Sequence, residues 1–206
     1  MIITYQGLES FRISHGDLVL AINPVSKDSK HKSKSFGADV TLITTNHPDM
    51  NGADQTSRGD KESFIINGPG EYEVKDVFVK GFLSETEYQG TKLNTVYLAT
   101  FEGMNLCFLG ALSNPALSSE TLETLENVDI LFTPVDGDGV LSAEQAYKLA
   151  VSLEPAIIIP MHYSEATLKQ FLKEGGGEKS DTLDKLVIKK KDLEDRKSDI
   201  IVLKQE

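Results

Sequence analysis

The chain has a single cysteine, no tryptophan and no long run of apolar residues. One cysteine excludes a disulfide framework. Cys107 lies in the apolar run 105–109, where we expect a small buried hydrophobe rather than a nucleophile. No stretch approaches the roughly 18 apolar residues of a membrane span, so we expect no membrane insertion. The first residues have no basic segment followed by an apolar one, as a signal peptide would, and we expect a cytoplasmic protein.

Basic residues are also scarce. The sequence has 21 Lys and Arg against 32 Asp and Glu, which gives a net charge of −11. Nonspecific binding to nucleic acid depends on Lys and Arg that neutralise phosphates, so we expect no nucleic-acid partner. The basic clusters Lys27 to Lys34 and Lys189 to Lys191 are local exceptions, and we expect solvated faces there. The length of 206 residues predicts one domain, residues 1–206.

The order of the predicted elements indicates the fold class. Short runs of β-branched and aromatic residues predict an antiparallel meander of strands at Ile2 to Tyr5, Ser10 to Ile13, Leu18 to Ile22, Val40 to Thr44, Phe64 to Ile66, Tyr72 to Val74, Val77 to Phe82, Asn94 to Thr100 and Asn105 to Leu109. Helices that begin at Ser118, Ser142 and Ser164 then alternate with strands at Asp129 to Phe132, Ala156 to Pro160, Leu186 to Lys189 and Ile200 to Leu203. Strands first and alternation later predict an α/β fold of two packed sheets with helices outside, a four-layer αββα sandwich.

A short loop after the strand at Val40 to Thr44 contains residue types that bind metal ions. His47 and Asp49 stand two residues apart just past a buried strand, which is a common way to place an imidazole and a carboxylate on one cation. Thr45 and Met50 stand where further ligands would be useful. The loop is therefore typical of a metal site that lacks some of its ligands.

Several segments together resemble the metallo-β-lactamase superfamily, and more narrowly its small UlaG-like branch of metal-dependent hydrolases. They occur in the family's order over most of the chain: Tyr5-Gln6-Gly7, Asn23-Pro24, the loop Thr45 to Met50, Gly68 to Val74, Leu109-Gly110, Val128 to Leu131, Leu153-Glu154-Pro155 and Ile157 to Tyr163. The resemblance implies the αββα fold and a metal-dependent hydrolase that acts on lactones, esters or phosphodiesters.

The same resemblance implies that four of seven family metal ligands are lost. The family's loop is His-x-His-x-Asp-His, and this chain retains His47 and Asp49 but has Thr45 and Met50 at the first and last His. The later His of the family matches His162. The chain has no counterpart of the intermediate His, which the family carries near residues 82–86, because no His lies between residues 47 and 162. At the position of the acid that bridges the two metals stands Ala111.

We therefore expect a noncatalytic pseudo-hydrolase that acts in binding or assembly and has no cofactor. The alternative is a hydrolase with a single Zn or Mn ion on His47, Asp49 and His162, with Asp49 as a catalytic residue and help from Asp136 or Asp138. Structural roles for the same residues also stay open: Asp49 as a helix cap, and His162 hydrogen-bonded to backbone.

Three further expectations concern the surroundings of this site. A partner-binding module, including a homo-oligomer, would be favoured if apolar side chains such as Met50 and Phe108 fill the former pocket. Glu71, in the Gly68 to Tyr72 loop, is expected to be a pocket residue or to bond a loop amide. His15 and His31 are expected to be solvated.

Overall fold

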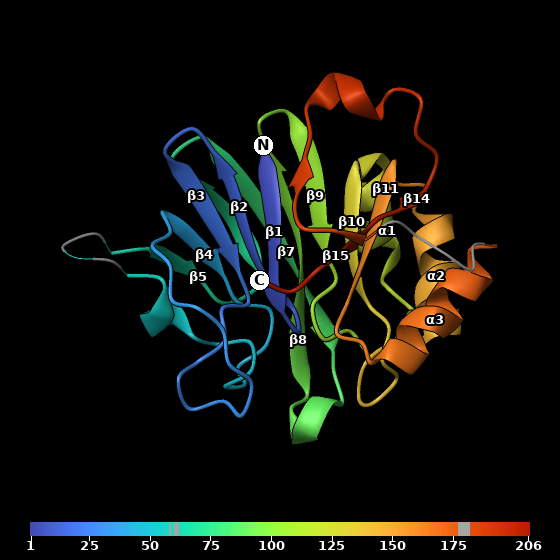
Figure 1. Cartoon of the computed structure of the whole chain (residues 1–206), viewed down its shortest axis with the longest axis horizontal. Coiled ribbons are helices and arrows are strands. Elements are labelled where there is room, and N and C mark those ends of the chain that lie inside the picture. The colour runs from blue at the N-terminus through green and yellow to red at the C-terminus, as the bar shows by residue number, and fades with distance from the viewer. Residues whose placement is uncertain (58, 60–61, 177–181) are drawn as a thin grey trace.

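Two mixed β-sheets face each other in the computed structural model, which describes residues 1–57, 59, 62–176 and 182–206 (Figure 1). The six-stranded first sheet has the order β13-β1-β2-β3-β4-β5, and the seven-stranded second sheet has the order β14-β11-β10-β9-β8-β7-β6. A third pair joins β12 and β15. The strands are β1 Ile2–Gly7, β2 Ser10–His15, β3 Leu18–Ile22, β4 Val40–Leu42, β5 Phe64–Ile66, β6 Gly70–Val74, β7 Val77–Glu85, β8 Leu93–Phe101, β9 Met104–Phe108, β10 Ile130–Pro134, β11 Ile157–Met161, β12 Thr182–Leu183, β13 Leu186–Val187, β14 Asp199–Ile200 and β15 Val202–Leu203.

Helices flank this pair of sheets, which gives the αββα arrangement that the sequence predicted. They are α1 Ser119–Thr124, α2 Ala143–Ser152 and α3 Glu165–Glu174, with short 3-10 helices η1 Ala53–Gln55, η2 Tyr88–Gly90, η3 Leu125–Asn127 and η4 Lys190–Leu193. Ser118, Ser142 and Ser164 cap the three α-helices, each by accepting a hydrogen bond from a backbone N–H of the first turn. No helix among the described residues is long and apolar enough to span a membrane.

Alternation along the strands of the second sheet divides the core into two layers. Phe108, Phe132 and Ile159 point between the two sheets and belong to one buried cluster. Their neighbours Cys107 and Leu131 belong to a second cluster, which packs against the apolar faces of α2 and α3. Cys107 is fully buried, as predicted. Phe108 stacks on Phe132 with 4.4 Å between ring centroids and is part of the core between the sheets.

The prediction of a wholly antiparallel meander is wrong for part of the first sheet. Strands β3, β4 and β5 run parallel, although β1 to β3 and β6 to β9 pair antiparallel as expected. A parallel pair needs a crossover of a dozen or more residues. Residues 23–39 and 43–63 provide these two crossovers. The predicted strand Ile200 to Leu203 is also two strands, because β14 pairs with β11 and β15 with β12.

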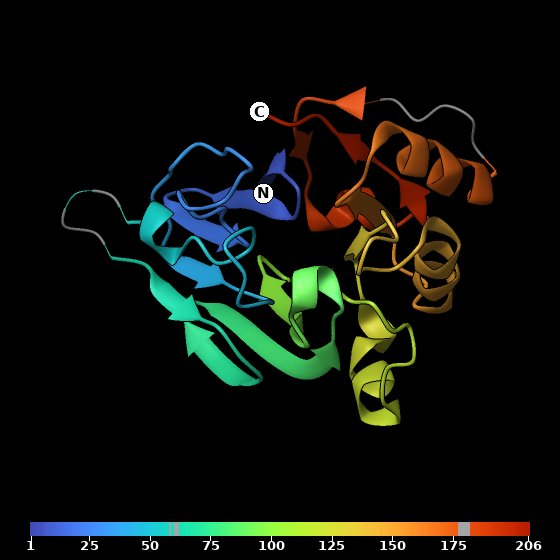
Figure 2. The same cartoon turned by 90° about the horizontal axis from the view of Figure 1, so that it is seen from below.

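The long crossovers and the ends of several strands meet at one edge of the molecule. The loop after β4, η2, the segment before α2 and the residue that follows β11 all lie there. Seen from below in Figure 2, η2 lies between the blue segments of the first sheet and the yellow and orange helical half. Five of the polar residues that the sequence singled out lie at this edge: His47, Asp49, Asp136, Asp138 and His162.

Candidate functional site

Asp49 is buried at the centre of this edge, in the loop after β4. Its Oδ1 accepts a hydrogen bond from the Ser29 hydroxyl, and its Oδ2 accepts one of 2.7 Å from the Tyr88 hydroxyl. Burial by itself raises the pKa of this carboxyl, but the hydrogen bonds from Ser29 and Tyr88 outweigh burial and hold the pKa below its ordinary value. Asp49 does not cap the following helix η1, which begins after Gly52 without a side-chain cap.

His47 and His31 lie on either side of this carboxylate. His47 Nδ1 is 3.5 Å from Asp49 Oδ2 and accepts a 3.2 Å hydrogen bond from the Asp49 backbone N–H. His31 Nε2 is 3.9 Å from the same oxygen, and 51% of its side chain is exposed. His31 and His15 are both exposed, as predicted, and His31 in addition lies beside the Asp49 carboxylate. No local pattern predicted that the Lys-rich segment folds back onto the loop after β4.

His162 follows β11 and is buried, with a left-handed backbone φ of 49°. Its Nδ1 lies 2.6 Å from Oε1 of Glu9, which is completely buried. The other Glu9 oxygen accepts a 2.9 Å hydrogen bond from the Asn23 amide. One alternative predicted that the backbone holds the His162 side chain, but the Glu9 carboxylate holds it instead. The backbone N–H of His162 donates a hydrogen bond to the carbonyl of Leu8. Sequence reasoning missed Glu9, which stands in an ordinary turn between β1 and β2.

Tyr88, in η2, connects the two histidines. Its ring packs edge-on against His47 with 5.2 Å between centroids, and against His162 with 4.9 Å. On its apolar side Tyr88 forms a buried cluster with Met50, Ala111 and Val140, and the half-buried Leu8 packs against this cluster. Burial, together with the hydrogen bond to Asp49, raises the pKa of the Tyr88 hydroxyl well above its ordinary value. Tyr88 is therefore a neutral hydrogen-bond donor at the centre of the site.

Asn94, on β8, organises the residues around Thr45. Its Oδ1 accepts hydrogen bonds from the Thr45 hydroxyl at 2.9 Å and from the Ala111 backbone N–H at 3.1 Å. Its amide nitrogen donates to the carbonyl of Leu109 at 2.8 Å. The positions at which the resemblance expects a histidine and a bridging acid thus belong to a closed network of neutral groups.

These residues do not fit a metal ion in the conformation seen. Among the side chains that the structure describes, no three from His, Cys, Asp or Glu converge in a way that could hold a metal. Both Asp49 oxygens already accept hydrogen bonds, and the Tyr88 ring occupies the space next to both imidazoles. Met50 and Ala111 add no donor that suits zinc or manganese. The arrangement is chemically that of a packed, hydrogen-bonded core with a pocket beside it.

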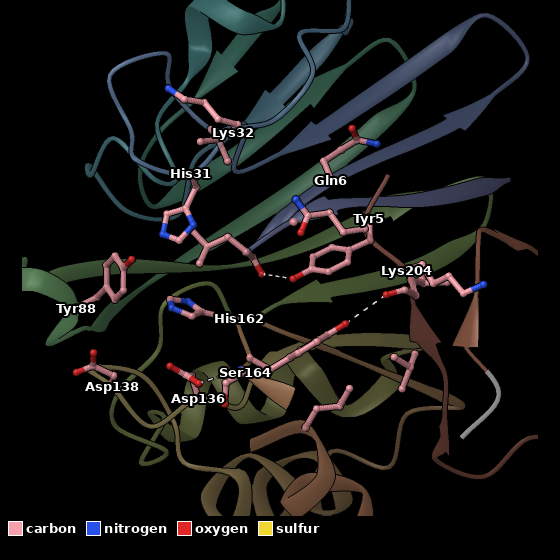
Figure 3. Close-up of a pocket in the computed structure, with 18 of the residues that line it drawn as sticks. Tyr5, Gln6, His31, Lys32, Tyr88, Asp136, Asp138, His162, Ser164 and Lys204 are labelled. Carbon is pink, nitrogen blue, oxygen red and sulfur yellow. Dashed lines mark hydrogen bonds between the residues drawn. The ribbon is translucent and has the colours of Figure 1, made fainter. Parts of the chain in front are cut away.

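That pocket has a volume of about 700 Å³ and opens beside Tyr88 and His162. Asp136 and Asp138 contribute to its wall, and so does His31 (Figure 3). Asp136 Oδ1 accepts hydrogen bonds from the Ser164 backbone N–H at 3.1 Å and from the Thr167 hydroxyl at 3.0 Å. The predicted acidic turn therefore faces the pocket.

The Gly68 to Tyr72 loop takes no part in this pocket. Part of it is strand, since β6 begins at Gly70. The Glu71 carboxylate is 77% exposed and 3.2 Å from the ammonium of Lys80. Neither expectation for Glu71, a pocket residue or a bond to a loop amide, is correct. The Tyr72 hydroxyl donates to the carbonyls of Gly68 and Pro69 instead.

Comparison with known families identifies the chain. The family model described as "Beta-lactamase superfamily domain" matches residues 2–162. The chain belongs to the metallo-β-lactamase superfamily. Its two mixed sheets flanked by helices are the metallo-β-lactamase fold.

Several solved structures resemble this chain over most of its length. A proposed Zn-dependent hydrolase of the superfamily from Thermotoga maritima matches with a TM-score of 0.76 and 24% identity, over 98% of this chain and 99% of that one. A proposed metal-dependent hydrolase from Parabacteroides distasonis has a TM-score of 0.66 and 20% identity, over 85% and 90% of the two chains. A metallo-hydrolase from Ignicoccus hospitalis has a TM-score of 0.62 and 17% identity, over 86% and 92%. At such identities the likeness establishes the fold and leaves the activity to the site.

Proposed function

We propose that this protein is a noncatalytic pseudo-hydrolase of the UlaG-like branch of the metallo-β-lactamase superfamily, and that it uses its pocket to bind a small molecule. The observation that carries the proposal is the Tyr88 ring, which packs against both His47 and His162 and donates its hydroxyl to Asp49. All three retained candidate ligands thereby contact one neutral phenol.

The residues at the lost ligand positions support the proposal. Met50 is fully buried against Tyr88, and Ala111 packs in the same cluster. Thr45 is buried and donates its hydroxyl to Asn94. A cation here would need space, negative charge and donor atoms at once. The packing around Tyr88 removes the space, and the substitutions remove the donors.

Metal analysis of the full chain tests the proposal. The protein is purified without chelator, incubated with zinc or with manganese, desalted, and its metal content measured. We expect well under one equivalent of either metal. Stoichiometric metal that disappears in His47→Ala or His162→Ala, but persists in the exposed control His15→Ala, would overturn the proposal.

One observation favours a second candidate, the hydrolase with a single metal on His47, Asp49 and His162. Glu9 holds Nδ1 of His162, which leaves Nε2 directed away from that carboxylate. Metal-bound histidines commonly have a carboxylate behind them in this way. Hydrolysis of a lactone, an ester or a phosphodiester that requires His162 and tracks the bound metal would establish this candidate.

A further inference from the structure

The pocket beside Tyr88 has charges of opposite sign on opposite walls. Figure 3 shows His31 and Lys32 on one side and Asp136 and Asp138 on the other, with His162 between them. In a chain with a net charge of −11, a basic wall is a local departure from the overall charge.

The basic wall is held by a buried anchor. The Ser29 hydroxyl donates to Asp49 and also accepts a 2.9 Å hydrogen bond from the backbone N–H of His31. The Lys32 ammonium donates one hydrogen bond of 3.3 Å to the carbonyl of Ser29. An ammonium has three donors, so Lys32 retains hydrogen-bonding capacity for a ligand. His31 and Lys32 are exposed, as predicted for the cluster Lys27 to Lys34, and both also line the pocket.

In the acidic wall, hydrogen bonds hold Asp136 in place. The hydrogen bonds from Ser164 and Thr167 fix the carboxylate of Asp136 at the start of α3. Because a carboxylate already occupies this helix start, the helix does not offer a second anion site to a ligand. Asp138 is exposed and forms no ion pair with any described residue. This wall therefore favours a cation.

The pocket lining also has apolar surface, to which Tyr5, Leu8 and Leu203 contribute. The volume of about 700 Å³ is within the usual range of small-molecule sites, about 300–1,000 Å³. Lys204 also lines the pocket, and its ammonium is 3.0 Å from the Asp184 carboxylate.

We propose that the pocket binds a zwitterionic small molecule of the short-peptide class, with its carboxylate toward His31 and Lys32 and its ammonium toward Asp136 and Asp138. A purely anionic ligand would be repelled by the acidic wall, and a purely cationic one by the basic wall. This inference rests on the proposed function, because a divalent cation in the pocket would change its charge balance.

Isothermal titration of the full chain in EDTA tests the inference directly. The probes are triglycine and trileucine, each with free ends, with an acetylated amino end, with an amidated carboxyl end, and with both ends blocked. We expect at least one free tripeptide to bind about tenfold or more tightly than either of its singly blocked forms. No binding by either peptide, equal binding by blocked and free forms, or tighter binding of the acetylated anion would each overturn the inference.

Variants assign each end of the peptide to its wall. In Lys32→Gln the advantage of a free carboxylate over an amide should shrink, while the advantage of a free amine stays. Asp138→Asn should show the reverse, and the control variants Lys34→Gln and Asp17→Asn, away from the pocket, should behave as wild type. Equal losses for both ends in both variants would contradict the assignment. Stoichiometric metal in the separate metal analysis would overturn the proposed function alone, whereas failed peptide binding by metal-free protein would overturn this inference alone.

Discussion

The Tyr88 hydroxyl donates a 2.7 Å hydrogen bond to Oδ2 of Asp49, and both residues are buried. Removal of this hydroxyl leaves a buried carboxylate with one strong donor fewer. We expect Tyr88→Phe to lower the free energy of unfolding by about 1–3 kcal/mol, measured by urea denaturation.

The control for this variant is Tyr72→Phe. The Tyr72 hydroxyl bonds the carbonyls of Gly68 and Pro69 at the surface, where water can replace it. Its loss should change the free energy of unfolding by about 0.5 kcal/mol or less. Equal changes in the free energy of unfolding in the two variants would show that the hydrogen bond to Asp49 adds no more stability than a surface hydrogen bond.

The Tyr88 ring should also decide whether a metal site can be rebuilt. We expect the triple variant Thr45→His, Met50→His and Ala111→Asp to take up little zinc, because the phenol still occupies the space beside His47 and His162. Adding Tyr88→Ala should raise the zinc content toward one equivalent or more, measured after desalting. Circular dichroism checks that both variants are folded. Full zinc uptake by the triple variant would mean that Tyr88 does not block the site.

Gly139 should be sensitive to substitution because of Tyr88. A Cβ added there would lie 2.7 Å from Cα and 2.8 Å from the backbone N of Tyr88. Gly103 has a similar φ, +69° against +74°, but a Cβ on it meets nothing within 4 Å. Both alanine variants carry the cost of a left-handed backbone, and Gly139→Ala should lose at least about 1 kcal/mol more, in the range of overpacking. Equal losses in urea denaturation would contradict a close approach at Gly139.

Glu9 should be important for stability because two buried groups depend on it. Glu9→Ala would remove the partner of His162 Nδ1 and one of the two acceptors of the Asn23 amide, which also donates to Thr44. We expect a loss of about 3–5 kcal/mol of unfolding free energy, as for a buried pair that loses one partner. Glu9→Gln keeps one acceptor oxygen and should lose less. A Glu9→Ala protein with wild-type stability would show that this pair is not needed for folding.

The lowered pKa of Asp49 gives its contribution to stability a defined pH dependence. A carboxyl whose pKa is lower in the folded state stabilises the fold fully above the unfolded pKa, here about 3.8, and loses this contribution as the pH falls through the folded value. The stability difference between wild type and Asp49→Asn should therefore be constant from pH 7 to about pH 5 and shrink below about pH 4. Urea denaturation of both proteins across this range measures it. A difference that grows on acidification would have the wrong sign.

Local signals predicted the elements of the fold better than their pairing. Ser118, Ser142 and Ser164 act as the helix caps that the sequence indicated, because a cap is decided within three residues. The parallel direction of β4 was not predicted, because strand direction depends on the path of the connection before the strand. Residues 23–39, which form that connection, contain no helix or repeat that would indicate a crossover.

In the candidate site, too, local patterns predicted individual residues but not the contacts between distant ones. His47, Asp49 and His162 were singled out from short motifs, and the structure places each of them against Tyr88. Tyr88 itself was missed because it stands in a short polar turn after β7 with no motif around it. Its role comes from contacts to residues 39 and 74 positions away in the chain, which no local pattern encodes.

Asn94 connects the two sheets by hydrogen bonds of its side chain. Thr45 follows β4 of the first sheet, Ala111 follows β9 of the second, and one side-chain oxygen on β8 holds both. These bonds are neutral and involve no titrating group, so neither chelators nor salt should loosen this edge. The relative positions of these three strand ends therefore depend on hydrogen bonds within the chain that carry no charge.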